Sequence, residues 1–413
     1  MSGKHKDHLP WPIPHEAMHF AGYRAMREMA AKRPESIGYG ALGMYLFSHA
    51  MWLADEVRRG GFDRVVFLAR DGFYVKEAFD RVKEALALPV ETSYVRISRQ
   101  AAFPLHFRTP DDLDMLPVWV DYTAHTPHTL LRLFAPVLPD RDAGAVMAAA
   151  GLPLDQSLTE QTWPVFRDAY RAHLWDAVRV EAYGARAAAY LSPHFTGRCA
   201  TFDVGYNLRS ESVIGDMTGA DITAFITHTD SDVPDHRGVP YRTLYGASPY
   251  VSWVAREQFL LEDAPCCVGY DGNGPVLEAE YRSPSVAVRA CQQEALVFVE
   301  DMVRTCGANL RNMPFRPADG CAAFEHFLHC ARRREMLPFK ENEVENDFHN
   351  GAVEDDSVFL QWRLMQTDYR AAVTGEAAAI TRARRALIRL RENPGSFLRK
   401  LERKSTKSHE NSV

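Results

Sequence analysis

The clearest hydrophobic pattern of the chain lies in its first hundred residues. A short apolar run rich in β-branched residues, at 65–68, predicts a buried parallel strand. A helix-period pattern follows at 73–86, and the turn between the two, at 69–72, carries a cation, a carboxylate and a glycine. A unit of this kind places polar groups at the carboxyl edge of an α/β sheet, where the ligands of such sheets bind.

Further apolar runs predict four more strands, at residues 91–97, 199–202, 220–227 and 241–246. The run at 199–202 is followed by Asp203, Gly205 and a helical pattern, so it repeats the strand-glycine-helix arrangement. Strands that alternate with helices are typical of βαβ units. The sequence therefore predicts an α/β fold with a Rossmann-like, mostly parallel sheet.

Proline-punctuated helical patterns interrupt this rhythm at residues 104–195, where no strand is obvious and one long helix is expected at 163–191. We interpret the segment as a helical insertion or cap over the sheet edge. The expected division is an N-terminal arm and helix (1–36), the first part of the α/β core (37–103), the helical insertion (104–195), the second part of the core (196–285), a helical C-terminal region (286–374) and a basic amphipathic tail (375–413).

Composition narrows the function classes. The net charge of −6 does not favour a general polyanion binder, and without a recognised binding motif nucleic acid is not an expected partner. The seven cysteines show no CxxC motif, which favours free thiols in a reducing compartment. Neither a signal peptide nor an apolar run of about 18 residues is found, so we expect a cytoplasmic protein.

The tail differs from the rest of the chain in charge. Between residues 371 and 413, ten Lys and Arg stand against four Asp and Glu, and Leu387 and Leu390 contribute to an apolar side. A basic amphipathic end predicts peripheral contact with an anionic inner-membrane surface. Docking on the acidic body of the protein, or on a partner, is the alternative.

Polar residues follow three of the predicted strands. Arg70 and Asp71 follow the first strand, and Ser98 and Arg99 follow the second. Asp203 takes the equivalent position after a later strand. Guanidinium and hydroxyl groups at such an edge suit a phosphate or carboxylate ligand. The alternatives are an ordinary ion pair in the first turn, a capping serine with a surface arginine in the second, and a turn-capping Asp203.

Small and polar residues complete these turns. Gly72 lets the backbone bend and approach a ligand, and Gly205 takes the same place in the later unit. Asn207 and Arg209 stand at the start of the helix that follows. Two such units in one chain favour an anionic ligand at this edge.

Four segments resemble a bacterial family, marked by a LARDG motif, that is found with surface-polysaccharide (capsule, O-antigen) biosynthesis proteins. The segments are FLARDG at 67–72, ISR at 97–99, FDVGYN at 202–207 and REQFLLEDAPCCVGYD at 256–271. The match covers roughly residues 40–280. Members are often described as haloacid-dehalogenase-like predicted hydrolases, so the resemblance implies phosphate chemistry in glycan assembly. It adds Tyr206 and Glu257 to the candidate residues.

The chain departs from such hydrolases at the nucleophile. A phosphatase of the haloacid-dehalogenase type needs DxD after its first strand: the first Asp attacks phosphorus, the second is the acid/base, and Mg²⁺ screens the charge. If Asp71 matches the second Asp, Ala69 takes the place of the nucleophile and cannot form a phospho-enzyme. The activity is then lost or the chemistry differs. A phosphoribosyltransferase-like fold is a competing resemblance, but residues 202–212 lack its paired acids and its Gly/Thr-rich loop.

Three hypotheses follow: an enzyme acting on a phosphorylated or nucleotide-linked sugar, a phosphoribosyltransferase-like transferase, and a non-catalytic partner of glycan-synthesis proteins. In the first, Asp71 and Asp203 are acid/base residues or Mg²⁺ ligands. The residues expected to bind substrate are Arg70, Gly72, Ser98, Arg99, Gly205, Tyr206, Asn207, Arg209 and Glu257. Convergence of Asp71 and Asp203 within one metal-bridging distance, about 5 Å or less, favours the two enzymes. Dispersal, or an edge plugged by residues 104–195, favours the third hypothesis.

Overall fold

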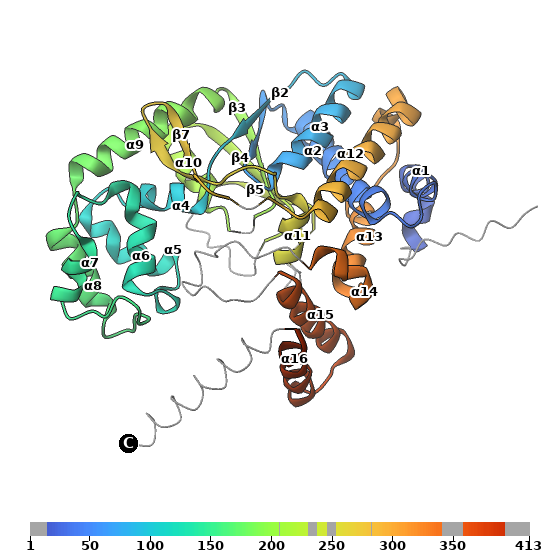
Figure 1. The fold of residues 1–413 in the computed structure, drawn as a ribbon. Helices are drawn as coiled ribbons and strands as arrows, with labels where there is room; N and C mark the ends of the chain where they lie inside the picture. The colour runs from blue at the N-terminus through green and yellow to red at the C-terminus, as the bar shows by residue number, and fades with distance from the viewer. Residues whose placement is uncertain are drawn as a thin grey trace, which may run out of the picture.

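A computed structural model confirms the α/β fold, with one all-parallel sheet between helices (Figure 1). The structure describes residues 15–205, 207–229, 238–245, 253–281, 283–340 and 358–392. The sheet has the order β2-β1-β3-β4-β5. Its strands are β1 (Arg64–Leu68), β2 (Glu91–Val95), β3 (Arg198–Asp203), β4 (Asp221–Ile226) and β5 (Tyr241–Thr243). A separate antiparallel hairpin is formed by β6 (Cys267–Asp271) and β7 (Gly274–Leu277).

The helices occur in three groups along the chain. Before β2 lie η1 (His15–His19), α1 (Ala21–Ala30), the π-helix η2 (Ile37–Leu42), α2 (Gly43–Gly60) and α3 (Gly72–Leu86). Between β2 and β3 lie α4 (Arg99–Ala102), α5 (Leu116–Trp119), α6 (Pro127–Phe134), α7 (Ala143–Ala149), α8 (Trp163–His173) and α9 (Ala177–Leu191). After β3 come α10 (Arg209–Thr218), α11 (Trp253–Leu260), α12 (Val286–Cys306), α13 (Pro317–Cys330), α14 (Arg333–Met336), α15 (Val358–Thr374) and α16 (Ala378–Glu392). Single 3₁₀ turns are η3 (Phe103–His106), η4 (Pro110–Met115), η5 (Tyr122–Ala124), η6 (Ala135–Val137), η7 (Ser192–His194), η9 (Gly307–Asn312) and η10 (Leu337–Phe339).

The two faces of the sheet belong to two different hydrophobic cores, because successive side chains of a strand point to opposite faces. Val65 and Phe67 of β1 belong to a core shared with α2, α3, α12 and α13. Val66 and Leu68 belong to a second core, built with α6, α8, α9 and α10. Figure 1 shows these helices on opposite sides of the strands. The insertion between β2 and β3 therefore supplies much of the cover for one sheet face.

The insertion is helical, as the proline-punctuated sequence predicts, and every residue between β2 and β3 is described. The expectation of one long helix at 163–191 is wrong, because the structure has two helices there, α8 and α9. The side chain of Asp176 accepts a hydrogen bond from the amide of Arg179, 3.1 Å away. A side-chain cap of this kind starts a new helix, and here it outweighs the continuous helical pattern.

The ends of the chain are described only in part. Residues 1–14 of the expected arm and residues 393–413 of the expected tail lie outside the described residues. Within the tail, α16 forms ion pairs with the neighbouring part of the chain, Arg385 with Asp368 and Arg384 with Glu376. No helix among the described residues is long and apolar enough to cross a membrane. All seven cysteines are free thiols, as expected, and Cys330 is exposed.

The first core depends on close helix contact between η2 and α12. A Cβ placed on Gly38 would lie 2.6 Å from the Cα of Cys291, and backbone atoms cannot move aside as a flexible side chain can. Gly38→Ala should therefore force the helices apart and cost about 1–3 kcal/mol of unfolding free energy. Gly215→Ala in α10 is the control: no atom lies within 4 Å of its Cβ position, and alanine should stabilise the helix by about 0.5–1 kcal/mol. Urea unfolding of both variants measures the difference, and equal stabilities would contradict this account of the packing.

Candidate active site

The first part of the site is the turn after β1. The amide of Ala69 donates to the carbonyl of Val95 at 3.0 Å, so the pairing of β1 with β2 extends one residue beyond the strand. The amide of Phe73 donates to the carbonyl of Arg70 at 3.2 Å and closes the turn as α3 begins at Gly72. The turn therefore holds Arg70 and Asp71 at the carboxyl edge of the central strand.

The second part is the turn after β3. Asp203 ends the strand, and its carboxylate accepts hydrogen bonds from the backbone amides of Val204 and Gly205. A Cβ on Gly205 would lie 2.9 Å from Oδ2 of Asp203, so a larger residue would shift the carboxylate. Gly205 thus allows the close approach of the Asp203 side chain to the turn.

The strand order brings these turns together. β1 and β3 are direct neighbours in the sheet, although about 130 residues separate them in the chain. The chain runs outward from β1 to β2 on one side and from β3 to β5 on the other, so the order reverses between β1 and β3. Ligands of doubly wound sheets bind outside the carboxyl ends of the strands at such a switch point. Asp71 and Asp203 stand on its two sides.

Three carboxylates interact at this edge. Burial raises the pKa of Asp71 well above its usual range, and the negative charges of Glu257 and Asp203 raise it further. Glu257 lies on α11, far along the chain, so the structure brings all three acids together. Burial also raises the pKa of Asp203, but the amides of Gly205 and Val204 and the charge of Arg99 oppose this shift. Asp203 therefore has backbone donors that favour its ionised form, in addition to the charge of Arg99.

Two arginines supply the positive charge. Arg70 and Arg99 both act to lower the pKa of Asp71, and Arg99 does the same for Asp203. Nη1 of Arg70 also donates to the carbonyl of Ala264 at 3.3 Å, which ties the first turn to the segment after α11. The predicted Arg70, Arg99, Asp71 and Asp203 therefore belong to one electrostatic cluster.

Ser98 has a structural role in this arrangement. Its hydroxyl donates to the carbonyl of Cys267 and accepts from the amide of Ala101 at 3.1 Å, which caps α4. This is the capping alternative that the sequence left open. Ser98 thus helps to position Arg99, the next residue along the chain.

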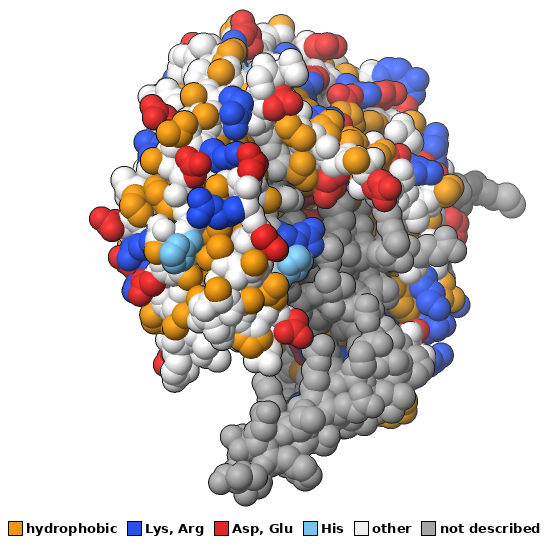
Figure 2. Space-filling view, turned by 60° about the vertical axis from the view of Figure 1, so that its left-hand side comes forward, with side chains coloured by type: hydrophobic (Ala, Val, Ile, Leu, Met, Phe, Trp, Pro, Cys, Tyr) orange, Lys and Arg blue, Asp and Glu red, His pale blue; other side chains and the backbone are white. Residues whose placement is uncertain are grey.

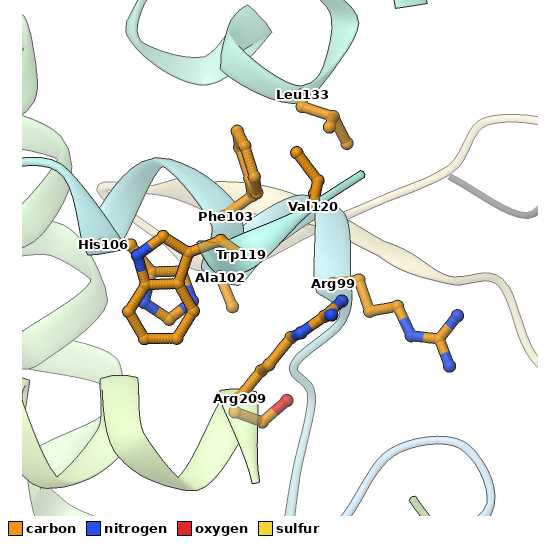
Figure 3. A pocket seen from close by; sticks show the side chains of 9 residues that line it. Arg99, Ala102, Phe103, His106, Trp119, Val120, Leu133 and Arg209 are labelled. Carbon is orange, nitrogen blue, oxygen red and sulfur yellow. The ribbon is translucent and has the colours of Figure 1, made fainter. Parts of the chain in front are cut away.

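The remaining candidates lie around the second turn. Gly72 is buried at the start of α3, and Asn207 is half-buried in the turn that leads to α10. Arg209, the first residue of α10, lines a pocket together with Arg99 (Figure 3). Tyr206 lies outside the described residues.

Sequence reasoning missed the contacts that hold the segment after α11 over the edge. Glu262 accepts a hydrogen bond from the hydroxyl of Tyr94 at 2.6 Å and from Nη2 of Arg96 at 2.9 Å. Its position five residues after Glu257, inside the segment that carries the resemblance, is a signal that could have pointed to it. These two hydrogen bonds anchor the segment after α11 to β2 and to Arg96, the residue that follows it.

The pocket beside Arg99 and Arg209 was missed as well. Its other walls come from η3 and the insertion, and include Phe103, His106 and Trp119 (Figure 3). Phe103 and His106 share η3, whereas Trp119 ends the separate helix α5, so the sequence gives no signal that the three meet. Away from the pocket, Figure 2 shows acidic and basic side chains interspersed on the visible face of the molecule, without one dominant sign of charge.

Asp71 and Asp203 are too few to hold a metal ion by themselves, so a bound substrate would have to supply further ligands. Among the described residues, no group of three or more His, Cys, Asp or Glu side chains is arranged to hold a metal ion. Mg²⁺ at phosphate-transfer sites often takes one or two carboxylates and completes its coordination with substrate phosphates and water. Asp71 and Asp203 match that donor set, with the phosphate supplied by the substrate.

No protein-family model matches the chain, and no curated protein matches it.

The raised pKa of Asp71 gives a pH-dependent stability. A folded-state pKa above the unfolded value of about 3.9 means that the folded protein binds more protons, so stability falls as pH rises through the interval between the two values. The slope from this group is at most about 1.4 kcal/mol per pH unit. Asp71→Asn removes the buried ionisable group, so the variant should gain stability over wild type as pH rises.

Thermal or urea unfolding between pH 5 and pH 8 measures this difference. Asp216→Asn, an exposed position on α10, should keep the wild-type pH dependence. Parallel stability curves for wild type and Asp71→Asn would show that Asp71 is ionised in the folded protein over the whole range.

Proposed function

We propose that the protein is an α/β enzyme of bacterial surface-polysaccharide biosynthesis that acts at a phosphate centre of a phosphorylated or nucleotide-linked sugar. The observation that carries the proposal is the cluster of Asp71, Asp203 and Glu257 with Arg70 and Arg99 at the switch point of the sheet. Titratable groups with shifted pKa values at a ligand-binding edge are typical of active sites.

The two aspartates have environments suited to different roles. Asp71, whose pKa is raised by burial and by the charges of Glu257 and Asp203, is the general acid that protonates the leaving oxygen. Asp203, held by two backbone amides and the charge of Arg99, is the carboxylate that accepts the proton of the attacking hydroxyl or water. In each reaction Asp71 loses a proton and Asp203 gains one. Exchange of protons with solvent then restores both residues for the next cycle.

The arginines hold the substrate in this scheme. Guanidinium groups bind phosphate through paired, charge-assisted hydrogen bonds. Arg70 and Arg99 lie among the acids, so a phosphate bound to them would stand beside both aspartates. As the alternative to their acid/base roles, Asp71 and Asp203 would both be ionised and would hold Mg²⁺ together with that phosphate, and the ion would supply charge neutralisation.

The chemistry cannot follow the phospho-enzyme route of the haloacid-dehalogenase type. Ala69 stands two residues before Asp71 and carries only a methyl group. The proposal is therefore a direct transfer to water or to an acceptor hydroxyl, which makes the protein a hydrolase or a transferase.

The context of glycan assembly rests on the four resembling segments. A phosphoribosyltransferase-like reaction uses the same edge and is the second candidate, although residues 202–212 lack its phosphate-loop pattern. The electrostatic interaction of Asp71 with Glu257 and Asp203 supports both enzymes over the non-catalytic partner. A cytoplasmic location, with peripheral inner-membrane contact through the tail, belongs to the proposal, and the exposed Ile380 and Leu387 of α16 support that contact.

A ligand screen by thermal shift tests the proposal. The ligands are sugar phosphates, nucleotide sugars and phosphoribosyl pyrophosphate, each with and without Mg²⁺. A ligand at 100 times its Kd stabilises the folded protein by about 2.7 kcal/mol. We expect such a shift in wild type and in Asp216→Asn, and its loss in Asp203→Asn.

Turnover provides the second measurement. Product formation from the ligand that binds, followed by phosphorus NMR, should fall by about 100-fold or more in Asp71→Asn and Asp203→Asn. Full activity in both variants would contradict their assigned roles. A folded wild type that responds to no ligand would overturn the proposed enzyme in favour of the non-catalytic partner.

A further inference from the structure

We infer that the pocket beside the acidic cluster binds a nucleobase, so that the substrate of the site is a nucleoside diphosphate derivative. This inference rests on the proposed function and narrows its substrate class. The pocket lies between the first turns of α4 and α10 and the insertion.

The pocket has two chemically different sides. Arg99, Arg209 and Ser210 form a polar side at the carboxyl edge of the sheet. The other side is apolar and aromatic, and consists of Phe103, Trp119, Val120 and Leu133 (Figure 3). A ligand that fills it must therefore join an anionic group to a flat or apolar group over a short distance.

Arg99 connects the pocket with the acids. It lines the pocket, and its charge also lowers the pKa of both Asp71 and Asp203. In Figure 3 the side chain of Arg99 extends away from the aromatic residues, and that of Arg209 rises beside it. Arg99 both lines the pocket and acts on the two aspartates, so a diphosphate held by Arg99 would connect a base in the pocket with a reacting sugar at the acids.

The aromatic side is a rigid, partly exposed platform. The rings of His106 and Trp119 stack with centroids 3.7 Å apart and an interplanar angle of 23°. Both residues are half-buried, so their rings are held by packing and still reach the pocket. Bases stack on such side chains because every base presents a flat π-face.

A nucleobase suits this pocket better than an isoprenoid chain. Three of the lining residues, His106, Trp119 and Ser210, are of types that carry hydrogen-bonding groups, and base edges carry hydrogen-bond donors and acceptors. A hydrocarbon chain offers no hydrogen bond to such groups. Isoprenyl diphosphates therefore become an outcome of the test.

Calorimetric titration of the full chain tests the inference. The probes are UDP, ADP and GDP, with inorganic pyrophosphate as the ligand that lacks a base and geranyl diphosphate as the isoprenoid ligand. At least one nucleoside diphosphate should bind about tenfold or more tightly than pyrophosphate, the lower range expected for one stacked base.

Variants separate the two halves of the pocket. Trp119→Ala should remove the tenfold preference and leave the Kd of pyrophosphate unchanged, whereas Trp119→Phe should keep most of the preference. Arg209→Gln should weaken both ligands. Trp175→Ala is the matched control, because Trp175 is a half-buried tryptophan of the same insertion that does not line the pocket.

The outcomes distinguish this inference from the proposed function. Equal affinity for pyrophosphate and all three nucleotides, equal losses for both ligands in Trp119→Ala, or tighter binding of geranyl diphosphate would overturn the nucleobase assignment alone. If no phosphate-bearing ligand binds to the folded wild type, the proposed function fails together with it.

Discussion

Parallel pairing of β1 with β2 on one side and β3 on the other is the constraint on which the site depends. Leu68 pairs with Val95, and Phe67 pairs with Phe202. The three strands therefore end at nearly the same level. Polar residues that follow each strand must meet at one edge, although they come from distant parts of the sequence. The register of the sheet thus determines which charges lie together.

Those charges are costly to bury. A buried carboxylate loses its hydration, and nearby carboxylates repel one another. The protein offsets this cost unevenly: Asp203 receives two backbone hydrogen bonds, whereas Asp71 has Arg70 and Arg99 against two negative neighbours. The ionised form of Asp203 is therefore favoured by backbone donors, and that of Asp71 by neighbouring arginines. Charged groups that lower folding stability in this way are typical of functional sites.

The sequence predicted the local units better than their assembly. The β1–α3 unit was expected within one residue of its true helix start, because a buried strand and an amphipathic helix leave strong, short-range patterns. No local sequence pattern predicts that β1 and β3 are neighbours. Whether Asp71 and Asp203 lie on adjacent strands was therefore left open by the sequence. Glu257 entered through resemblance alone. The break between α8 and α9 was missed because one capping residue, Asp176, outweighed a continuous helical period.

The insertion between β2 and β3 has a consequence for how this protein can diverge. Its helices share a core with Val66 and Leu68, so they cover the sheet as well as line the pocket. A segment that both covers the sheet and lines the pocket cannot be lost or exchanged as a unit, since its removal would expose one face of the central strands to solvent. New ligand preferences would therefore have to arise by single substitutions in its short helices, each limited by the core beneath.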